Sequence, residues 1–178
     1  MTEFLSEESI NLHRDYIRKQ RLKYSILEKS IDGIRSKRVS EILHMRLSAG
    51  DAKDIFALLP EIELHEIYFS SFSDMKNSSS SKVRETYGAE GAMLNELYKL
   101  GMALDYGFVV VNRKGARIET LALNDYAASF TMGVPMLSLD VCEHAYFSDY
   151  GFDKSSYLVN ALSYLNLGKI DSFFSENK

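Results

Sequence analysis

The sequence is poor in cysteine, in excess charge and in long apolar runs. One cysteine, Cys142, in 178 residues excludes an internal disulfide and a cysteine-rich zinc site, and it favours a reducing compartment. The 21 basic and 25 acidic residues leave a formal net charge of -4, so we expect neither a nucleic-acid partner nor an anionic membrane partner. No run approaches the roughly 20 apolar residues of a membrane span. The first eight residues carry acids where an export signal has basic residues, so we expect a soluble, cytoplasmic protein.

Helical patterns fill the first part of the chain. Ser6, followed by two glutamates, is a favourable helix start, and apolar residues at spacings of three and four predict a helix to about residue 30. A second helix is expected from about Arg38 to Leu47. Gly50 is interpreted as a helix stop before a short third helix. Pro60 is expected to open another helix, because its fixed φ suits a first helical position.

The second part of the chain is predicted to be mixed. The polar run Asn77 to Ser81 is interpreted as a linker, at residues 77–82, between a helical lobe (1–76) and an α/β lobe (83–178). Helical patterns are expected at about 91–104, 142–148 and 155–165, the last stopped by Gly168, and strands at 108–111, 118–123 and 134–139. The sequence therefore predicts an α+β fold, in which an N-terminal helical hairpin precedes a three-stranded antiparallel sheet with helices.

Three of the four histidines lie where they could converge with a carboxylate. His13 and His65 are on the inner faces of two predicted helices, and His144 comes four residues after Asp140 at the end of a predicted strand. A lone histidine on an apolar face is usually a core residue whose hydrogen bonds are satisfied. Three imidazoles and a carboxylate together indicate a metal site.

The segment Asp140-Val141-Cys142-Glu143-His144-Ala145-Tyr146 closely resembles the Asp-x-Trp-Glu-His-Ala-Tyr signature of iron/manganese superoxide dismutases. The similarity continues, in order, through an early helix with His13, a second helix with His65, a three-stranded segment, and Asp149-Tyr150 before a closing helix. It thus extends over nearly the whole chain.

The resemblance implies that His13, His65, Asp140 and His144 bind one iron or manganese ion per subunit. The implied activity is dismutation of superoxide to dioxygen and hydrogen peroxide by redox cycling of the metal. Glu143 would reach across a two-fold interface to His144 of the partner subunit, so the resemblance also implies a homodimer. His44 has no counterpart among the ligands, and we expect it to be structural or exposed.

The sequence departs from the family where a glutamine normally bonds the metal-bound solvent. One such place aligns with Glu61, four residues before His65; Glu61 could be an extra ligand, a proton-transfer group or a brake on the redox potential, or simply an acid at a helix start. The other place falls near residues 124–126, where the Asn124 carboxamide or the Tyr126 phenol could substitute, unless both are turn residues. The choice between iron and manganese stays open.

Arg21 aligns with the family's gateway tyrosine. It could attract superoxide or another anion, or be an ordinary solvated arginine. Ile17 and Phe147 replace the other groups of the usual outer proton path, and Cys142 replaces a tryptophan, which makes the pocket wider. We interpret the chain as a superoxide dismutase-like oxidoreductase. The alternatives are an iron- or manganese-dependent oxidase or oxygenase acting on a small anionic organic substrate, and a non-catalytic relative.

Overall fold

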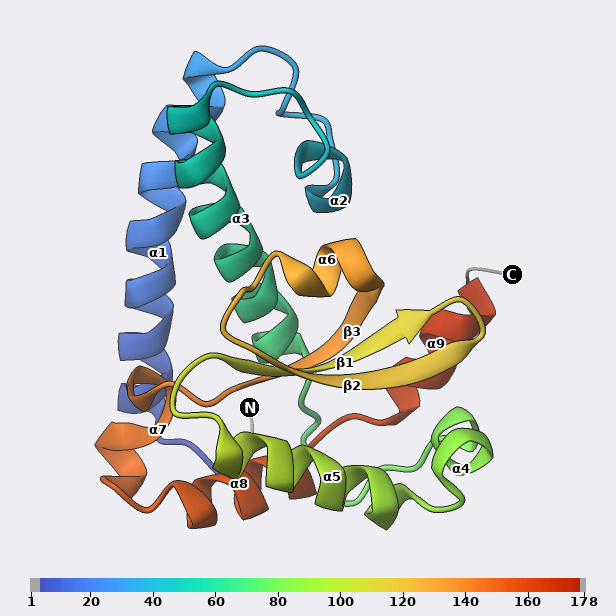
Figure 1. The fold of residues 1–178 in the computed structure, drawn as a ribbon. Helices are drawn as coiled ribbons and strands as arrows, with labels where there is room; N and C mark the ends of the chain where they lie inside the picture. Colours follow the sequence, from blue (N-terminus) through green and yellow to red (C-terminus); the bar gives the residue numbers. More distant parts are fainter. Residues whose placement is uncertain (1–3, 177–178) are drawn as a thin grey trace.

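The computed structural model describes residues 4–176. Residues 1–3, part of the segment on which the expected lack of an export signal depends, lie outside the described residues, as do 177–178. Two long helices, α1 (Glu7–Ser30) and α3 (Ala49–Ser70), run side by side as a hairpin (Figure 1). The Ser6 hydroxyl accepts a hydrogen bond from the Ser9 amide, so the predicted start of the first helix is confirmed.

The region between residues 38 and 70 differs from the prediction. The short helix α2 covers only Val39–Ile42, and α3 is one continuous helix that begins after Ser48, whose hydroxyl accepts from the Asp51 amide. Gly50 therefore lies in the first turn of α3, and Pro60 lies in its interior. Proline removes one hydrogen bond from the helix. Apolar side chains buried on both sides of Pro60 keep the helix packed through it: Ile55, Leu59, Ile62 and Leu64.

Three antiparallel strands form a sheet with the order β2-β1-β3: β1 (Phe108–Lys114), β2 (Arg117–Leu123) and β3 (Val134–Asp140). The central strand β1 begins with five buried residues and pairs with both neighbours. Phe108 lies opposite Leu123 on one side and Asp140 on the other, so the end of β3 lies beside the start of β1. The predicted α+β fold, a helical hairpin followed by this sheet with helices, is confirmed.

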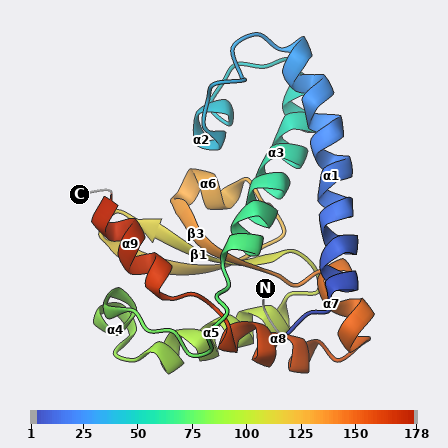
Figure 2. The same cartoon turned by 180° about the vertical axis from the view of Figure 1, so that it is seen from behind.

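Six further helices surround the sheet: α4 (Ser81–Tyr87), α5 (Glu90–Ala103), α6 (Ala128–Met132), α7 (Glu143–Tyr150), α8 (Lys154–Ser163) and α9 (Gly168–Glu176). α5 and α8 pack together below the sheet in Figure 1, and Figure 2 shows α3 and α9 at β3 from behind. The prediction that Gly168 ends the last helix is wrong, because α9 begins there. α4 and α6 are only seven and five residues long, too short for periodicity to reveal.

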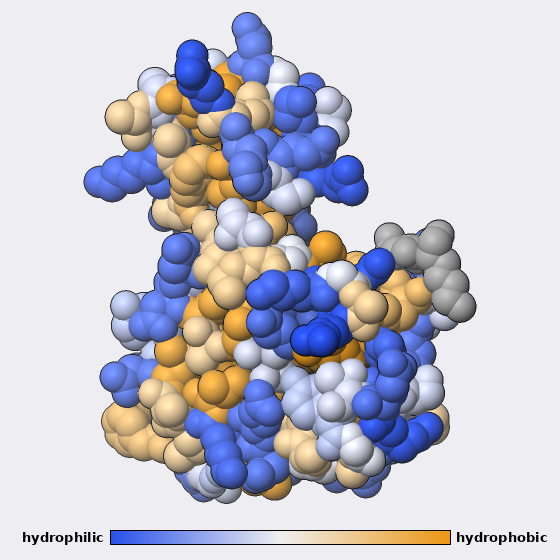
Figure 3. Space-filling view, turned by 45° about the vertical axis from the view of Figure 1, so that its right-hand side comes forward, coloured by the Kyte–Doolittle hydropathy of each residue, from blue (hydrophilic) through white to orange (hydrophobic). Residues whose placement is uncertain are grey.

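The buried apolar residues form two cores. The larger core joins the sheet to α3, α5 and α8, and the smaller consists of Ile34, Ile42, Ile55 and Leu59 at the hairpin tip. A hollow of about 460 Å³ lies between the tip and α6, although α2 also contacts α6, and Figure 3 shows a narrow waist between the upper and lower parts of the molecule. The division at residues 77–82 stays a prediction. Within residues 4–176, no helix has the length and apolar character that a membrane span needs.

Candidate metal centre

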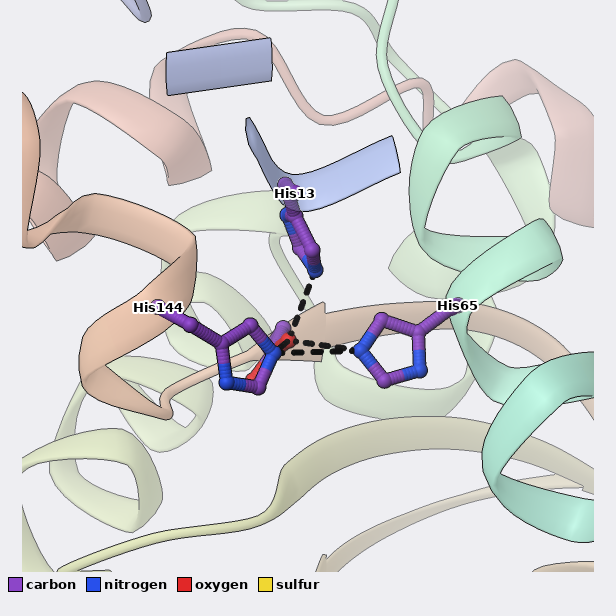
Figure 4. A group of neighbouring side chains, drawn as sticks. His13, His65 and His144 are labelled. Atoms are coloured by element: carbon purple, nitrogen blue, oxygen red, sulfur yellow. Dashed lines mark hydrogen bonds and ion pairs between the residues drawn. The ribbon is translucent and has the colours of Figure 1, made fainter. Parts of the chain in front are cut away.

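Three histidines and one aspartate from four different elements meet beside the larger core. His13 comes from the second turn of α1, His65 from α3, Asp140 from the last position of β3, and His144 from the first turn of α7. The first three are buried and His144 is half-buried, and one ligand atom from each lies within 4.8 Å of the others. Figure 4 shows the three imidazole rings turned toward a common point. We call these four residues the histidine–aspartate cluster.

Three ring nitrogens of this cluster converge on a single carboxylate oxygen. Asp140 Oδ2 lies 2.9 Å from Nε2 of His144 and 3.1 Å from Nε2 of both His13 and His65. Among residues 4–176, His13 Nε2 and Asp140 Oδ2 are nevertheless buried without a hydrogen-bond partner, although they lie only 3.1 Å from each other. Such orphaned atoms are costly unless something else satisfies them. Lone pairs aimed at one point fit a metal ion, and an imidazole and carboxylate donor set suits iron or manganese.

Local structure fixes the orientation of these groups. Nδ1 of His65 lies 2.7 Å from the Glu61 carbonyl oxygen, which can only accept, so Nδ1 carries the proton and Nε2 offers its lone pair to the cluster. The other carboxylate oxygen of Asp140 accepts from the Cys142 amide at 2.8 Å. The Tyr157 hydroxyl donates to the Asp140 carbonyl at 2.7 Å. His65 and Asp140 are thus held by hydrogen bonds at atoms other than those that face the cluster.

Burial and charge act in opposite directions on these groups. Burial alone would raise the pKa of Asp140, but the three imidazoles outweigh burial and hold that pKa well below its usual value. Burial lowers the pKa of His13 in spite of Asp140. Burial also acts to lower the pKa of His144, but Asp140 and the charge of Glu61 outweigh it and raise that pKa. At neutral pH the site therefore offers an anionic carboxylate among imidazoles, as a cation requires.

Aromatic rings enclose the cluster. The Phe108 ring meets His65 edge-on at 4.8 Å, and the rings of Tyr68 and Phe69 lie about 5 Å from His13. The Tyr16 ring stacks on His144 at 4.5 Å between centroids. These rings exclude water and lower the local dielectric, which strengthens every charge interaction in the site.

Two predicted neighbours of the metal lie beside the cluster. Glu61 accepts a hydrogen bond of 2.6 Å from the Tyr16 hydroxyl. Tyr126 is half-buried, and its ring meets Phe108 edge-on at 5.2 Å. Burial, with the nearby negative charges of Asp140 and Glu61, raises the pKa of Tyr126, so its phenol keeps its proton. Asn124 is exposed just after β2.

The remaining predicted residues lie farther out. Arg21 is half exposed and forms an ion pair with Glu66 at 2.5 Å. Glu143 is exposed in the first turn of α7. His44 is exposed, with Nδ1 2.6 Å from the Ser40 carbonyl oxygen, as expected for a residue outside the ligand set.

The single cysteine is held in an unreactive form. Burial and the negative charge of Asp140 raise the pKa of the Cys142 thiol, so it lacks the thiolate that nucleophilic cysteines use. Its sulfur lies 3.2 Å from the Gly107 amide, which donates to it. Gly107 has φ +123°, and a Cβ there would lie 2.1 Å from the Leu123 carbonyl oxygen, so the chain passes the Leu123 backbone this closely only with glycine.

Sequence reasoning missed two tyrosines that support the cluster, Tyr16 and Tyr157. Tyr16 follows His13 by three residues, a spacing that places both on one face of a helix, so the signal was present. Tyr157 is fully buried on α8 and reaches Asp140 across 17 positions of sequence, which local patterns do not reveal.

Comparison with known proteins gives two matches. The family model described as "Iron/manganese superoxide dismutases, C-terminal domain" matches residues 69–172. An iron superoxide dismutase of Cupriavidus metallidurans is 28% identical over 102 residues, which cover 53% of this chain and 52% of that protein. The chain thus spans about half the length of the curated relative it matches. The matched family region includes Asp140 and His144, whereas His13 and His65 precede it.

Proposed function

The chain belongs to the iron/manganese superoxide dismutase family, and on that premise we propose that it binds one iron or manganese ion through the histidine–aspartate cluster and dismutates superoxide. The observation that carries the proposal is the convergence of four ligand atoms within 4.8 Å, drawn from four separate elements. A bound iron or manganese ion would supply one-electron redox chemistry, by which one superoxide becomes dioxygen and another becomes hydrogen peroxide.

Residues around the cluster can hold and donate the protons that peroxide formation consumes. The Tyr16 phenol donates to Glu61 at 2.6 Å, and burial with the neighbouring Glu61 raises the pKa of Tyr16. Tyr126 likewise keeps its phenolic proton. These hydroxyl groups, with the Glu61 carboxylate, are our candidates to hold protons beside the site.

Two further roles belong to this proposal. Arg21 supplies a local cation that attracts superoxide, and Glu66 offsets part of that charge. Glu143 contacts His144 of the partner subunit in a homodimer, which its exposure at the start of α7 permits. A cytoplasmic location, expected from the single cysteine, stays a prediction.

The direct test is the rate of superoxide decay per bound metal, measured by stopped flow on protein loaded separately with iron and with manganese. We expect catalysis with at least one metal, and that metal is then the functional one. Metal-loaded protein that leaves superoxide decay at its uncatalysed rate would overturn the proposal.

A second candidate function is an iron- or manganese-dependent oxidase or oxygenase acting on a small anionic organic substrate. It is favoured by a hollow of about 270 Å³ lined by Arg14, Ile17, Arg18, Arg21, Glu66 and Phe69. Phe69 also contacts the His13 ring, so this cationic hollow lies one side chain from the cluster. Oxygen uptake that depends on an added organic anion, in protein inert toward superoxide, would select this function.

A further inference from the structure

Glu61 lies next to the histidine–aspartate cluster without belonging to it. It precedes His65 by four residues on α3, a spacing at which two side chains of one helix lie close enough to bind one metal. Its charge acts on both His144 and Tyr126. Among the described residues, however, Glu61 is not part of the cluster whose atoms lie within 4.8 Å of one another.

The contacts of Tyr16 explain where the Glu61 carboxylate lies. Its hydroxyl donates to Glu61 Oε1 at 2.6 Å, the short length typical of a bond to a charged acceptor. Its ring is stacked on His144 at 4.5 Å with an interplanar angle of 27°, and it also lies 5.9 Å from the His65 ring. The hydroxyl is therefore fixed by contacts on α3 and α7, although Tyr16 belongs to α1.

We propose that Tyr16 is a positioning residue that holds the Glu61 carboxylate off the metal, so that Glu61 is an outer hydrogen-bond acceptor and not a fifth protein ligand. The inference rests on the proposed metal centre. An extra carboxylate ligand would occupy the coordination position that a small substrate needs, because catalytic metal sites keep one position open. Tyr16 thus determines whether the site stays open.

The test uses cobalt(II) as a spectroscopic probe that reports coordination without turnover. Visible d–d absorption weakens as coordination number rises, since geometry governs the spectrum of such ions. The variants are Tyr16→Phe, which keeps the stacked ring and removes the hydroxyl, Glu61→Gln, and the double variant. We expect Tyr16→Phe to lose d–d intensity as Glu61 binds, and Glu61→Gln and the double variant to keep the wild-type spectrum.

Three results would overturn the inference. The first is a wild-type spectrum in Tyr16→Phe. The second is the same loss of intensity in the double variant, which would assign the change to the hydroxyl alone. The third is an altered spectrum in Glu61→Gln, which would show that Glu61 is already a ligand while Tyr16 is in place. Wild-type protein that binds no cobalt would instead refute the metal centre itself.

Discussion

At the scale of the residue, the cluster is defined by four ligand atoms that, among the residues the structure describes, face one another. Asp140 Oδ2 is surrounded by three Nε2 atoms at 2.9 to 3.1 Å, and two of these four atoms are buried without a hydrogen bond. Removing one ligand from such a set should lower the metal affinity more than removing an outer hydrogen-bonding partner of a ligand. His144 is the informative choice, because it is the only half-buried member and its loss disturbs the core least.

His144→Ala should therefore lose its metal after dialysis, with a fall in affinity beyond the roughly 10- to 100-fold typical of losing an outer hydrogen-bonding partner. Metal per chain, measured by mass spectrometry of the dialysed protein, checks this. His44→Ala is the matched control, since His44 is exposed on the far hairpin tip and should keep full metal. Full occupancy in His144→Ala would show that the ligand assignment is wrong.

The Arg21–Glu66 ion pair gives a prediction about rate. Arg21→Ala should slow superoxide consumption, and Glu66→Gln, which frees the arginine charge, should speed it, each by about twofold at low salt for a unit charge roughly 10 Å away. Both effects should shrink between about 0.01 and 0.1 M ionic strength, as the screening length falls from about 30 to 10 Å. Stopped-flow rates over this range provide the measurement. Rates equal to that of the wild type in both variants would exclude steering by Arg21.

The site was largely predictable from sequence, for identifiable reasons. The segment Asp140 to Tyr146 carries two cluster members in a motif, and helical periodicity placed His13 and His65 on inner faces. The resemblance places the family's tyrosine at Arg21, two turns from His13, and therefore gives no reason to expect a tyrosine of the site at Tyr16. The hydroxyl that meets Glu61 instead comes from the first turn after His13.

At the scale of the element, the errors fall where packing overrides local signals. Gly50 and Pro60 predict helix boundaries, yet both lie within α3. Gly50 is in a first turn that Ser48 caps, and Pro60 is flanked by buried side chains. The strands were predicted well, because β-branched and apolar runs mark them directly. α9 was missed because its start at Gly168 looked like a stop.

The missed helix α9 stabilises another missed helix. Asp171 accepts from the amides of Ser81 and Lys82 at 2.9 Å and from the Ser80 hydroxyl at 2.8 Å, and so caps the start of α4. Burial would raise the pKa of Asp171, but these hydrogen bonds outweigh burial and lower it. Because the folded pKa is depressed below 3.8, the stabilisation is present above pH 3.8 and is lost as pH falls through the folded pKa.

Asp171→Asn should lower the free energy of unfolding by up to about 1 kcal/mol at pH 7, because it removes a negative charge from the N-terminus of a helix. The difference from wild type should shrink once the pH falls below 3.8. Urea unfolding between pH 7 and 3 measures it, with Asp54→Asn, an exposed position on α3, as control. A difference that stays constant through the acid range would show that the carboxylate charge does not stabilise the start of α4.

At the scale of the whole molecule, the surface proposed for the homodimer lies next to the histidine–aspartate cluster. α7 carries both His144 and Glu143, and it also presents the exposed Phe147, so the side of the cluster nearest solvent coincides with the surface proposed for the dimer. A partner there would cover the exposed part of His144. Dimer formation and metal-site integrity should then depend on each other.

Glu143→Ala should raise the dimer dissociation constant at least about tenfold, because each two-fold interface loses two copies of the charged contact. Sedimentation velocity over a concentration series measures it. Glu85→Ala removes the same charge from α4, at the opposite end of the molecule in Figure 1, and should leave the dimer intact. A wild-type protein that sediments as a monomer at all concentrations would reject the homodimer.

The most direct test of the central claim is to locate the metal. Anomalous X-ray diffraction at the iron or manganese edge, from crystals of metal-loaded protein, should show one peak per chain within bonding distance of Nε2 of His13, His65 and His144 and of an Asp140 carboxylate oxygen. A peak at any other place, or no peak in protein that contains stoichiometric metal, would contradict the assignment of this cluster as the metal centre.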